Sequence, residues 1–394
     1  MPCNNRATFE VRTIESMEDW RSIQGPWQAL SCGQAMQSFE WLSTWWTYYG
    51  PGHQLQIVAV FENDALVGAV PWYRHSTPLG EQLRYLGSGH VCSDYLTVLA
   101  RVDRKTEVED KIAEYLQCML NTNGSFLSSG KQPRKLHSIW LDGGLNDSWQ
   151  QRCLEVGRQS RFKGQIKLDT RSWRLAIPRT VAEMQRNLKG SSAGRKFKKC
   201  LQRLESGEVV VHRWKSPEEI NLGLDHLLRL HAARRASLGD QGCLADARFE
   251  PFLRSTIPQL CKQDLSSILA AEFEGQIVGA QLFLHAERTW QMYQSGMEPT
   301  ALSCEPGHTM ITAAICQAIE NDVGVIDFLR GDEPYKSYWG AEPTPLIEMR
   351  LVNPNLHAQA IETLFRHAKS VRNWTRSVWQ SLPGVATSPI SSSK

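Results

Sequence analysis

One short pattern occurs twice in this 394-residue chain, about half a chain apart. Residues 57–70 read IVAVFENDALVGAV, and residues 268–282 read ILAAEFEGQIVGAQL. In each copy an apolar run reaches Phe-Glu, turns on small or polar residues and resumes with Val-Gly-Ala, as two antiparallel strands joined by a tight turn would. We predict hairpins that turn at 63–64 and 275–276, and we infer two domains of the same plan.

Helices and further strands surround both hairpins. Apolar residues recur at helical spacing over 39–50 and 220–235, ahead of the first and the second hairpin. The second hairpin is followed by strand-like text at 288–298, a loop with Pro and Gly, a helical stripe at 308–322 and the apolar run 323–330. This alternation predicts an α/β protein with a β-α-β unit, whose helices cover the sheets.

Length and composition fit two globular domains. A single core rarely grows beyond about 250 to 300 residues, so 394 residues favour two domains. With 41% hydrophobic and 22% charged residues, the chain is neither disordered nor of low complexity. Its formal net charge of +3 provides no overall field that would select nucleic acid or an anionic membrane, so any site for a polyanion must be local.

The ten cysteines are scattered singly, without a C-x-x-C pair. The N-terminus lacks the apolar core of a secretory leader, and no stretch reaches the roughly 18 apolar residues of a membrane span. We therefore expect free thiols and a cytoplasmic location. Because the sequence has no H-E-x-x-H motif, no G-x-S-x-G motif and no close His/Asp cluster, we predict neither a metal site nor a serine hydrolase.

The most distinctive motif lies in the second half, with SGMEPTALSCEPGHTM at 295–310 and, after one helix, DFLRGDEPYKSYWGAEP at 327–343. On these residues, 187–345 resembles the GNAT acyltransferase superfamily. It is similar in particular to the tandem-GNAT acetyltransferases often labelled CelD/BcsL, which are associated with cellulose or exopolysaccharide biosynthesis and are related to the Fem aminoacyltransferases. Residues 39–46 and 93–95 resemble the first half of that family more faintly.

The resemblance implies an α/β fold of two GNAT-like domains, each a mixed sheet flanked by helices. Since the text near 160–170 is polar and aperiodic, we predict an N-terminal domain at 1–165, which shapes the acceptor site without a cofactor, and a catalytic acyl-CoA-binding domain at 166–353. Residues 354–394 read as a basic amphipathic helix followed by a Ser-rich tail. We expect this helix to dock on the protein, with weak peripheral contact to a membrane as the alternative.

The resemblance also implies an acyl-CoA site. The pyrophosphate would be received by the loop and first helical turn formed by Glu305, Pro306, Gly307, His308 and Thr309. A helix N-terminus suits a diphosphate because it offers free N–H donors and a partial positive charge. Glu305 would repel phosphate, so we expect its carboxylate to point away or to cap the helix.

Acid, base and phenol groups gather in the loop after the run 323–330. Acyl transfer from a thioester needs a base for the attacking group, a donor for the carbonyl oxygen and a proton for the leaving thiolate. Asp332 or Glu333 could serve as the base, and Tyr335 as the acid or carbonyl donor. The structural alternative is an ion pair between Asp332 and Arg330, with Tyr335 and Trp339 as wedges between the domains.

Further candidates surround this loop. Arg330 and Lys336 are predicted substrate contacts, and Arg234 is a plausible anchor for a substrate carboxylate or phosphate. His231 continues the apolar stripe of its helix, so it is expected to face the cleft, either as a catalytic group or as a hydrogen-bonded core residue.

Residues 186–203 hold seven basic side chains and no acidic one. We interpret this segment first as a solvated basic helix, second as a contact for an anionic or lipid-linked substrate, and third as a tRNA contact. Its spacing does not match a P-loop.

The predicted function is N- or O-acyl transfer, with acetyl from acetyl-CoA as the main case, to an amine or hydroxyl of a small molecule or glycan precursor bound between the two domains. A Fem-like transferase that uses aminoacyl-tRNA and a non-catalytic scaffold at a membrane surface are the alternatives. DNA is not an expected partner, and tRNA is the least favoured one.

Overall fold

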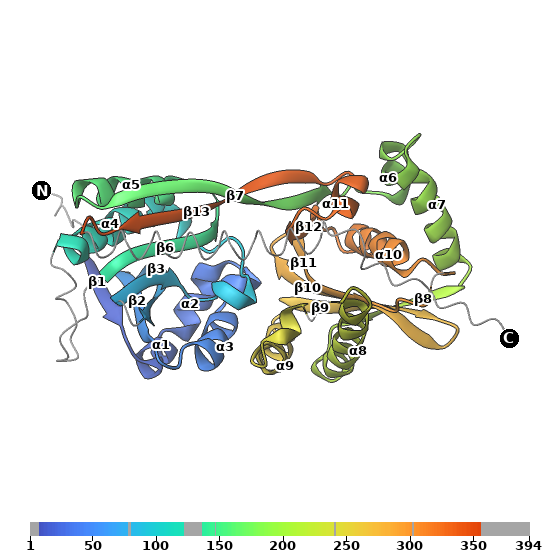
Figure 1. The fold of residues 1–394 in the computed structure, drawn as a ribbon, viewed down its shortest axis with the longest axis horizontal. Helices are drawn as coiled ribbons and strands as arrows, with labels where there is room; N and C mark the ends of the chain where they lie inside the picture. The colour runs from blue at the N-terminus through green and yellow to red at the C-terminus, as the bar shows by residue number, and fades with distance from the viewer. Residues whose placement is uncertain are drawn as a thin grey trace, which may run out of the picture.

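The computed structural model describes six stretches of the chain, residues 8–77, 80–121, 136–145, 147–239, 242–301 and 303–355. Within them the strands join one mixed sheet of 13 strands, with helices packed on both faces (Figure 1). The predicted α/β class is confirmed. From residue 356 on, the predicted C-terminal helix lies outside the described residues.

The first half of the chain builds one end of the sheet. Its strands are β1 (Phe9–Ile14), β2 (Gln54–Glu62), β3 (Ala65–Thr77), β4 (Gly80–Tyr85), β5 (Leu99–Ala100) and β6 (Leu136–Gly144). Its helices are α1 (Met17–Ser22), α2 (Gln24–Ser31), α3 (Phe39–Tyr49), α4 (Lys105–Asn121) and α5 (Ser148–Gln159). Each of β1 to β4 is antiparallel to the next, and β6, which follows α4, lies parallel to β4.

The second half repeats this plan. Its strands are β8 (Val209–Trp214), β9 (Ser266–Phe273), β10 (Gln276–Ala286), β11 (Thr289–Met297) and β12 (Val325–Arg330). Its helices are α6 (Val181–Asn187), α7 (Ser192–Glu205), α8 (Pro217–Ser237), α9 (Phe249–Cys261), α10 (Pro306–Glu320) and α11 (Pro334–Tyr338). Strands β8 to β11 are successively antiparallel, and β12, which follows α10, lies parallel to β11.

Both predicted hairpins are present, as β2–β3 and β9–β10. The first turns at 63–64, as predicted. The second turns at 274–275, one residue earlier than predicted, because Phe273 pairs with Gln276 and leaves two residues between them. All four turn residues have a positive φ, between 49° and 75°, which a two-residue turn of type I′ requires.

A glycine occupies the same position in each copy of the repeated pattern. Gly68 in β3 lies beneath α4, and a Cβ there would come within 2.2 Å of Val108 Cγ1. Gly279 in β10 lies beneath α10, and a Cβ there would come within 2.7 Å of Met310 Cγ. The glycine of the shared Val-Gly-Ala pattern therefore allows a helix to pack closely against the sheet in both halves.

Replacing Gly68 by alanine should destabilise the protein more than replacing Gly279. Val108 is β-branched and has one strongly preferred rotamer in a helix, so it cannot move aside, whereas the Met310 side chain is flexible. We expect a loss of about 3 kcal/mol for Gly68→Ala and about 1 kcal/mol for Gly279→Ala, measured by urea unfolding. Equal losses would contradict this account of the packing.

The two halves exchange their last strands. β13 (Glu342–Val352) pairs with β6 of the first half over 347–352, and β7 (Lys163–Ala176) pairs with β12 of the second half over 172–176. β7 and β13 also pair with each other, so both run along the junction (Figure 1). The predicted boundary between residues 165 and 166 thus falls inside β7, and β13, assigned to the second domain, completes the sheet of the first.

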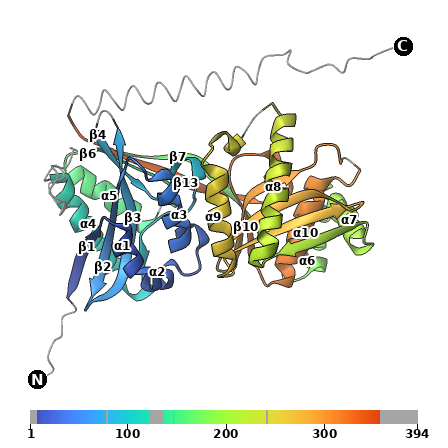
Figure 2. The ribbon, with the colours of Figure 1, turned by 90° about the horizontal axis from the view of Figure 1, so that it is seen from below.

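Aromatic side chains join the halves below this junction, where α3 packs against α9 (Figure 2). Trp41 of α3 is fully buried, and its ring meets Phe252 of α9 and Tyr293 of β11 edge to face, with centroids 5.0 and 5.2 Å apart. Its indole N–H donates to Ser93 Oγ over 2.9 Å. The aromatic stripe of 39–50 is therefore core, as predicted, and it belongs to the interface between the halves.

Candidate active site

Two parallel strands of the second half separate soon after they meet. β11 and β12 pair at three successive positions, 289–291 with 325–327, and no further. Beside the separated ends lies a cavity of about 330 Å³, lined by 292–295 of β11, 328–330 of β12 and residues of the first half that include Cys92 and Asp94. A concave site with polar walls at the carboxyl end of a parallel strand is the default candidate for an active site.

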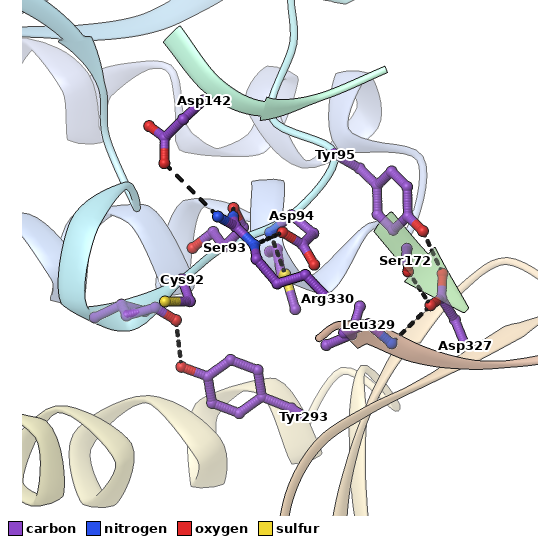
Figure 3. Close-up of polar contacts among 12 residues, drawn as sticks. Cys92, Ser93, Asp94, Tyr95, Asp142, Ser172, Tyr293, Asp327, Leu329 and Arg330 are labelled. Carbon is purple, nitrogen blue, oxygen red and sulfur yellow. Dashed lines mark hydrogen bonds and ion pairs between the residues drawn. The ribbon is translucent and has the colours of Figure 1, made fainter. Parts of the chain in front are cut away.

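A network of buried hydrogen bonds fixes the bend in β12. Leu329 has a φ of +55°, which is strained for a residue with a Cβ. The Asp327 carboxylate accepts hydrogen bonds from Leu329 N at 2.8 Å and from the hydroxyls of Ser172 and Tyr95 at 2.5 Å each (Figure 3). Since Ser172 lies on β7 and Tyr95 in the first half, Asp327 ties three parts of the fold to this bend.

Arg330, a predicted substrate contact, instead reaches across to the first half (Figure 3). Its Nε donates to Asp94 Oδ1 over 2.5 Å, and its Nη2 donates to the Ser93 carbonyl over 2.9 Å. The carboxylate of Asp142 lies 3.8 Å from Nη1. Gly143 leaves room for the guanidinium, because a Cβ there would lie 2.7 Å from Nη2. Arg330 therefore lines the cavity and also links its two sides.

Burial makes Asp94 a source of pH-dependent stability. The side chain is 1% exposed, and desolvation raises its pKa to about 6, although Arg330 acts in the opposite direction. Between the ordinary pKa near 4 and this value, the folded state keeps a proton that the unfolded state has lost. Stability should therefore fall, by up to about 3 kcal/mol from this group, as the pH rises from 4 to 7. Urea unfolding of wild type and Asp94→Asn between pH 4 and 7 checks this prediction. The variant should lack the part of the loss of stability that comes from the Asp94 carboxyl.

Lys336, the other predicted substrate contact, holds the loop after β12 from beneath. The side chain is 2% exposed, and its ammonium donates to the carbonyls of Leu329, Arg330 and Gly331 at 3.0 to 3.1 Å. Glu333 Oε2 lies 2.8 Å from the same nitrogen. Three carbonyls use the three protons of the ammonium, so Lys336 positions the loop and has no proton left for a substrate.

The two candidate general bases, Asp332 and Glu333, lie in different surroundings. Glu333 and Tyr335 both line the cavity. Asp332 does not: it is 58% exposed and contacts β7, where Trp173 Nε1 donates to it at 3.1 Å and Arg171 lies 3.5 Å away. It does not pair with Arg330 either, so the predicted ion pair between these two residues is wrong, and the role of Asp332 as a base stays a prediction.

Tyr335 keeps its proton in this site. Burial raises the pKa of its hydroxyl well above the ordinary value near 10, with a further contribution from the negative charge of Glu333. The hydroxyl forms no hydrogen bond with the described residues. A neutral phenol next to a cavity is suited to donating a hydrogen bond to a carbonyl oxygen.

His231 of α8 faces the cavity, as predicted, and is nearly buried. Its Nδ1 lies 3.0 Å from the carbonyl oxygen of Ser295, and its Nε2 lies 3.4 Å from Cys243 Sγ. The close approach depends on Gly296, where a Cβ would lie 2.4 Å from the backbone N of His231. The glycine in β11 thus lets α8 pack closely against the strand and fixes the distance of the imidazole from it.

The cavity is lined by Arg235 of α8 and not by Arg234, the predicted substrate anchor. Arg234 is exposed. On a helix, the residue four positions after His231 lies closer to the face of His231 than the residue three positions after it. The spacing from His231 to Arg235 was therefore the sequence signal for an arginine at the cavity. Cys92 and Cys243 also line the cavity. No motif marks either of them, because the fold brings them there from distant segments.

The carboxylate of Glu305, at the start of α10, pairs with cations of α7. Glu305, with a φ of +49°, lies at the N-cap position without capping the helix through its side chain. Its carboxylate is 2.5 Å from Lys196 Nζ and 3.4 Å from both Lys199 and Arg203 of α7, and the hydrogen bond from Lys196 lowers its pKa. Of the two expected arrangements of Glu305, the helix cap is therefore wrong, because the carboxylate pairs with α7.

The first turn of α10 offers few donors to a diphosphate. The N–H groups of His308 and Thr309 donate to the Glu305 carbonyl, and Pro306 has none. Gly307 keeps the one first-turn N–H without a hydrogen bond to the described residues, and a Cβ there would make ordinary contact with Met297 at 3.4 Å. Three cations and one N–H thus fit a phosphate group, provided that Glu305 moves aside.

Among the described residues, no group of three or more His, Cys, Asp or Glu side chains could hold a metal ion. In the same part of the chain, each helix is too short or too polar to cross a bilayer. The cysteines described by the structure are free thiols.

Comparison with known proteins gives a family for part of the chain. Residues 191–337 match the model of the acetyltransferase (GNAT) domain. This segment runs from α7 to α11 and includes the separating strands β11 and β12. A search of curated proteins gave no match. The second half therefore carries a GNAT-type acetyltransferase domain, in agreement with the predicted superfamily.

Solved structures share the fold of this protein over most of the chain. The crystal structure of FemX superimposes with a TM-score of 0.61 at 12% identity, over 90% of this chain and 99% of that chain. A conserved protein of unknown function from Bacteroides thetaiotaomicron gives a TM-score of 0.51 at 11% identity, over 87% of this chain and 100% of that chain. At these identities the likeness concerns the architecture, which extends over both halves.

Proposed function

We propose that this protein is an N- or O-acyltransferase that moves an acyl group, acetyl in the main case, from acyl-CoA to an amine or hydroxyl acceptor held between the two halves. The observation that carries the proposal is the cavity at the separation of β11 and β12. Most of its lining residues belong to the segment that matches the acetyltransferase domain, and the first half supplies the rest of its wall.

Two residues of the α11 segment have suitable chemistry for the transfer. Glu333, at the N-cap of α11, is the proposed base that takes the proton of the attacking amine or hydroxyl. Tyr335, kept neutral by burial, is the proposed donor to the carbonyl oxygen of the acyl group. Both depend on Lys336, which fixes the preceding loop through three carbonyls.

The donor would bind at the opposite side of β11 and β12, near α7 and α10. Lys196, Lys199 and Arg203 would hold its phosphates in place of Glu305, and the Gly307 N–H would add one hydrogen bond. Acyl-CoA supplies the activated thioester when it is bound. Calorimetric titration with acetyl-CoA tests this part, and the absence of binding would leave the donor unassigned.

The acceptor class follows from the resemblance to CelD/BcsL proteins. We infer a small molecule or glycan precursor of polysaccharide biosynthesis, acetylated in the cytoplasm, where free thiols such as those of the described cysteines are stable. The proposed acyl transfer requires neither DNA nor a lipid bilayer as a partner. Product profiling with acetyl-CoA and a mixture of candidate sugars and amino sugars identifies the acceptor.

Replacing Tyr335 by phenylalanine should lower the turnover of acetyl-CoA about a hundredfold, because the proposed hydrogen bond to the carbonyl oxygen is lost. Release of free CoA measures turnover, and calorimetry should find an unchanged affinity for acetyl-CoA. Tyr338→Phe is the matched control, since Tyr338 is on the same short helix but does not line the cavity. If both variants keep full turnover, Tyr335 is not the donor.

A Fem-like transfer from aminoacyl-tRNA is the second candidate. It is favoured by the first turn of α10, where only Gly307 keeps an N–H without a hydrogen bond to the described residues, and by the exposed cations Arg186, Lys189, Arg195 and Lys198 in and before α7. Titration with acetyl-CoA and with aminoacyl-tRNA distinguishes the two donors. A protein that binds neither would favour the non-catalytic scaffold, with the basic amphipathic helix predicted from the sequence of 354–394 as its contact to a membrane surface.

A further inference from the structure

We propose that Cys243 and His231 form a nucleophilic pair, in which the Cys243 thiol receives the acyl group from the donor before the acceptor does. The proposal rests on the proposed acyltransferase function and deepens it. It replaces direct transfer by two transfers, with a thioester on the protein as the intermediate. The pair comes from two segments of the second half, α8 and the short helical turn at Gly242–Ala245.

The hydrogen bonds of the imidazole determine which nitrogen can act as a base. The Ser295 carbonyl, 3.0 Å from Nδ1, can only accept, so Nδ1 carries a proton. In the neutral ring Nε2 is then an acceptor, and it lies 3.4 Å from Cys243 Sγ. The thiol therefore points its proton at the one nitrogen that can take it. A nucleophile, a base and a group that orients the base are the three parts of such a site.

Both residues line the cavity between the halves, together with Glu333 and Tyr335. Neither residue is therefore confined to the core: the sulfur of Cys243 is partly buried, and the cavity gives a substrate access to it. Gly296 adds precision, because the contact of α8 with β11 at this glycine sets the distance from His231 to Ser295. The acyl carbonyl that the proposed function brings to this cavity would thus meet a thiol and its base.

The environment of Cys243 makes the base necessary. Burial raises the pKa of this thiol to about 11, so at neutral pH it is protonated unless a partner removes the proton during attack. Arg235, which also lines the cavity, acts in the opposite direction and favours the thiolate. Cys316 offers a natural comparison, because burial raises the pKa of its thiol to about 11 as well, yet it forms no hydrogen bond with a histidine among the described residues.

The two transfers balance in atoms and charge. In the first, His231 Nε2 takes the Cys243 proton, the sulfur attacks the thioester carbonyl of acyl-CoA, the bond to the CoA sulfur breaks, and the imidazolium returns the proton to the CoA thiolate. In the second, the amine or hydroxyl of the acceptor attacks the acyl-Cys243 carbonyl. The bond to Cys243 breaks, and the acceptor proton passes through a base of the cavity to the Cys243 sulfur. No oxidant, reductant or further reactant is required.

The first test measures the reactivity of the thiol without any acyl donor. The full-length protein is treated with iodoacetamide at pH 7.5, and the alkylation of each cysteine is followed by peptide mass spectrometry. Cys243 should react at least tenfold faster than Cys316, and in His231→Gln it should slow to the rate of Cys316. Equal rates for the two cysteines in the wild type would overturn the pair.

The second test traps the intermediate. Acetyl-CoA without acceptor should leave one acetyl group on Cys243, labile to neutral hydroxylamine, and Cys243→Ser and His231→Gln should both lack this thioester. Cys316→Ser is the control and should form it normally. If acetyl groups reach an acceptor while Cys243 is never acetylated, transfer is direct and the proposal fails. If the protein neither binds acetyl-CoA nor releases CoA, the proposed function fails, and the alkylation rates still decide whether the pair exists.

Discussion

Replacing Arg330 by methionine is expected to lower the free energy of unfolding by about 3 to 5 kcal/mol at neutral pH. The guanidinium is the partner of Asp94, whose carboxylate is 1% exposed and accepts its hydrogen bond over 2.5 Å. Methionine fills a similar volume but leaves the buried carboxylate without its cation and the Ser93 carbonyl without its donor. Removing one partner of a buried pair costs much more than the pair itself is worth.

A double-mutant cycle separates this effect from a loss of packing. Arg330→Met, Asp94→Asn and the double variant are compared by urea unfolding at pH 7.5 and pH 5. The double variant should be more stable than the sum of the single losses implies, by at least 1 kcal/mol. Below pH 6 the loss in Arg330→Met should shrink, because the unpaired carboxyl can take a proton. If the losses in unfolding free energy add strictly at both pH values, the pair of Arg330 and Asp94 does not stabilise the contact between the halves.

Replacing Lys336 by methionine is expected to cost about 3 kcal/mol of stability and at least tenfold in turnover. Three carbonyls between Leu329 and Gly331 would lose their shared donor, and each buried group left unpaired costs roughly 1 to 3 kcal/mol, less the gain from not burying a charge. Turnover should fall because Glu333 and Tyr335 follow directly on this loop.

Lys198→Met is the matched control for Lys336→Met, since Lys198 is an exposed lysine of α7. It should change stability by less than 0.5 kcal/mol. Urea unfolding gives the stability, and release of CoA from acetyl-CoA gives the turnover. A Lys336→Met protein that is as stable as the control would show that the loop holds its conformation without the ammonium.

The parts of the fold that the sequence predicts are the local ones. The repeated hairpins, the α3 and α8 helices and the strand-helix-strand order from β11 to β12 follow from period and turn chemistry within short windows. The cavity residues His231, Glu333 and Tyr335 were found for the same reason: a helical stripe and the end of an apolar strand show on which side a residue lies.

The parts that the sequence does not predict depend on contacts between distant segments. Arg330 and Asp94 are 236 positions apart, so nothing in either neighbourhood identifies the pair. Glu305 meets the cations of α7 only because α7 packs against α10. Asp332 and Glu333 are neighbours in one loop, and only the positive φ of Gly331 and the clamp of Lys336 decide which of them faces the cavity.

Because β13 pairs with β6, the sheet of the first half cannot be completed until β13 has been synthesised. About 165 residues separate the end of β7 at Ala176 from the start of β13 at Glu342, which a ribosome adds in roughly 10 to 30 s. Throughout that time the edge of β6 lacks its neighbour and can pair with another strand. Codon usage, chaperones and expression temperature should therefore affect the yield of this protein through its first half, although the strand that the first half awaits is encoded near the end of the chain.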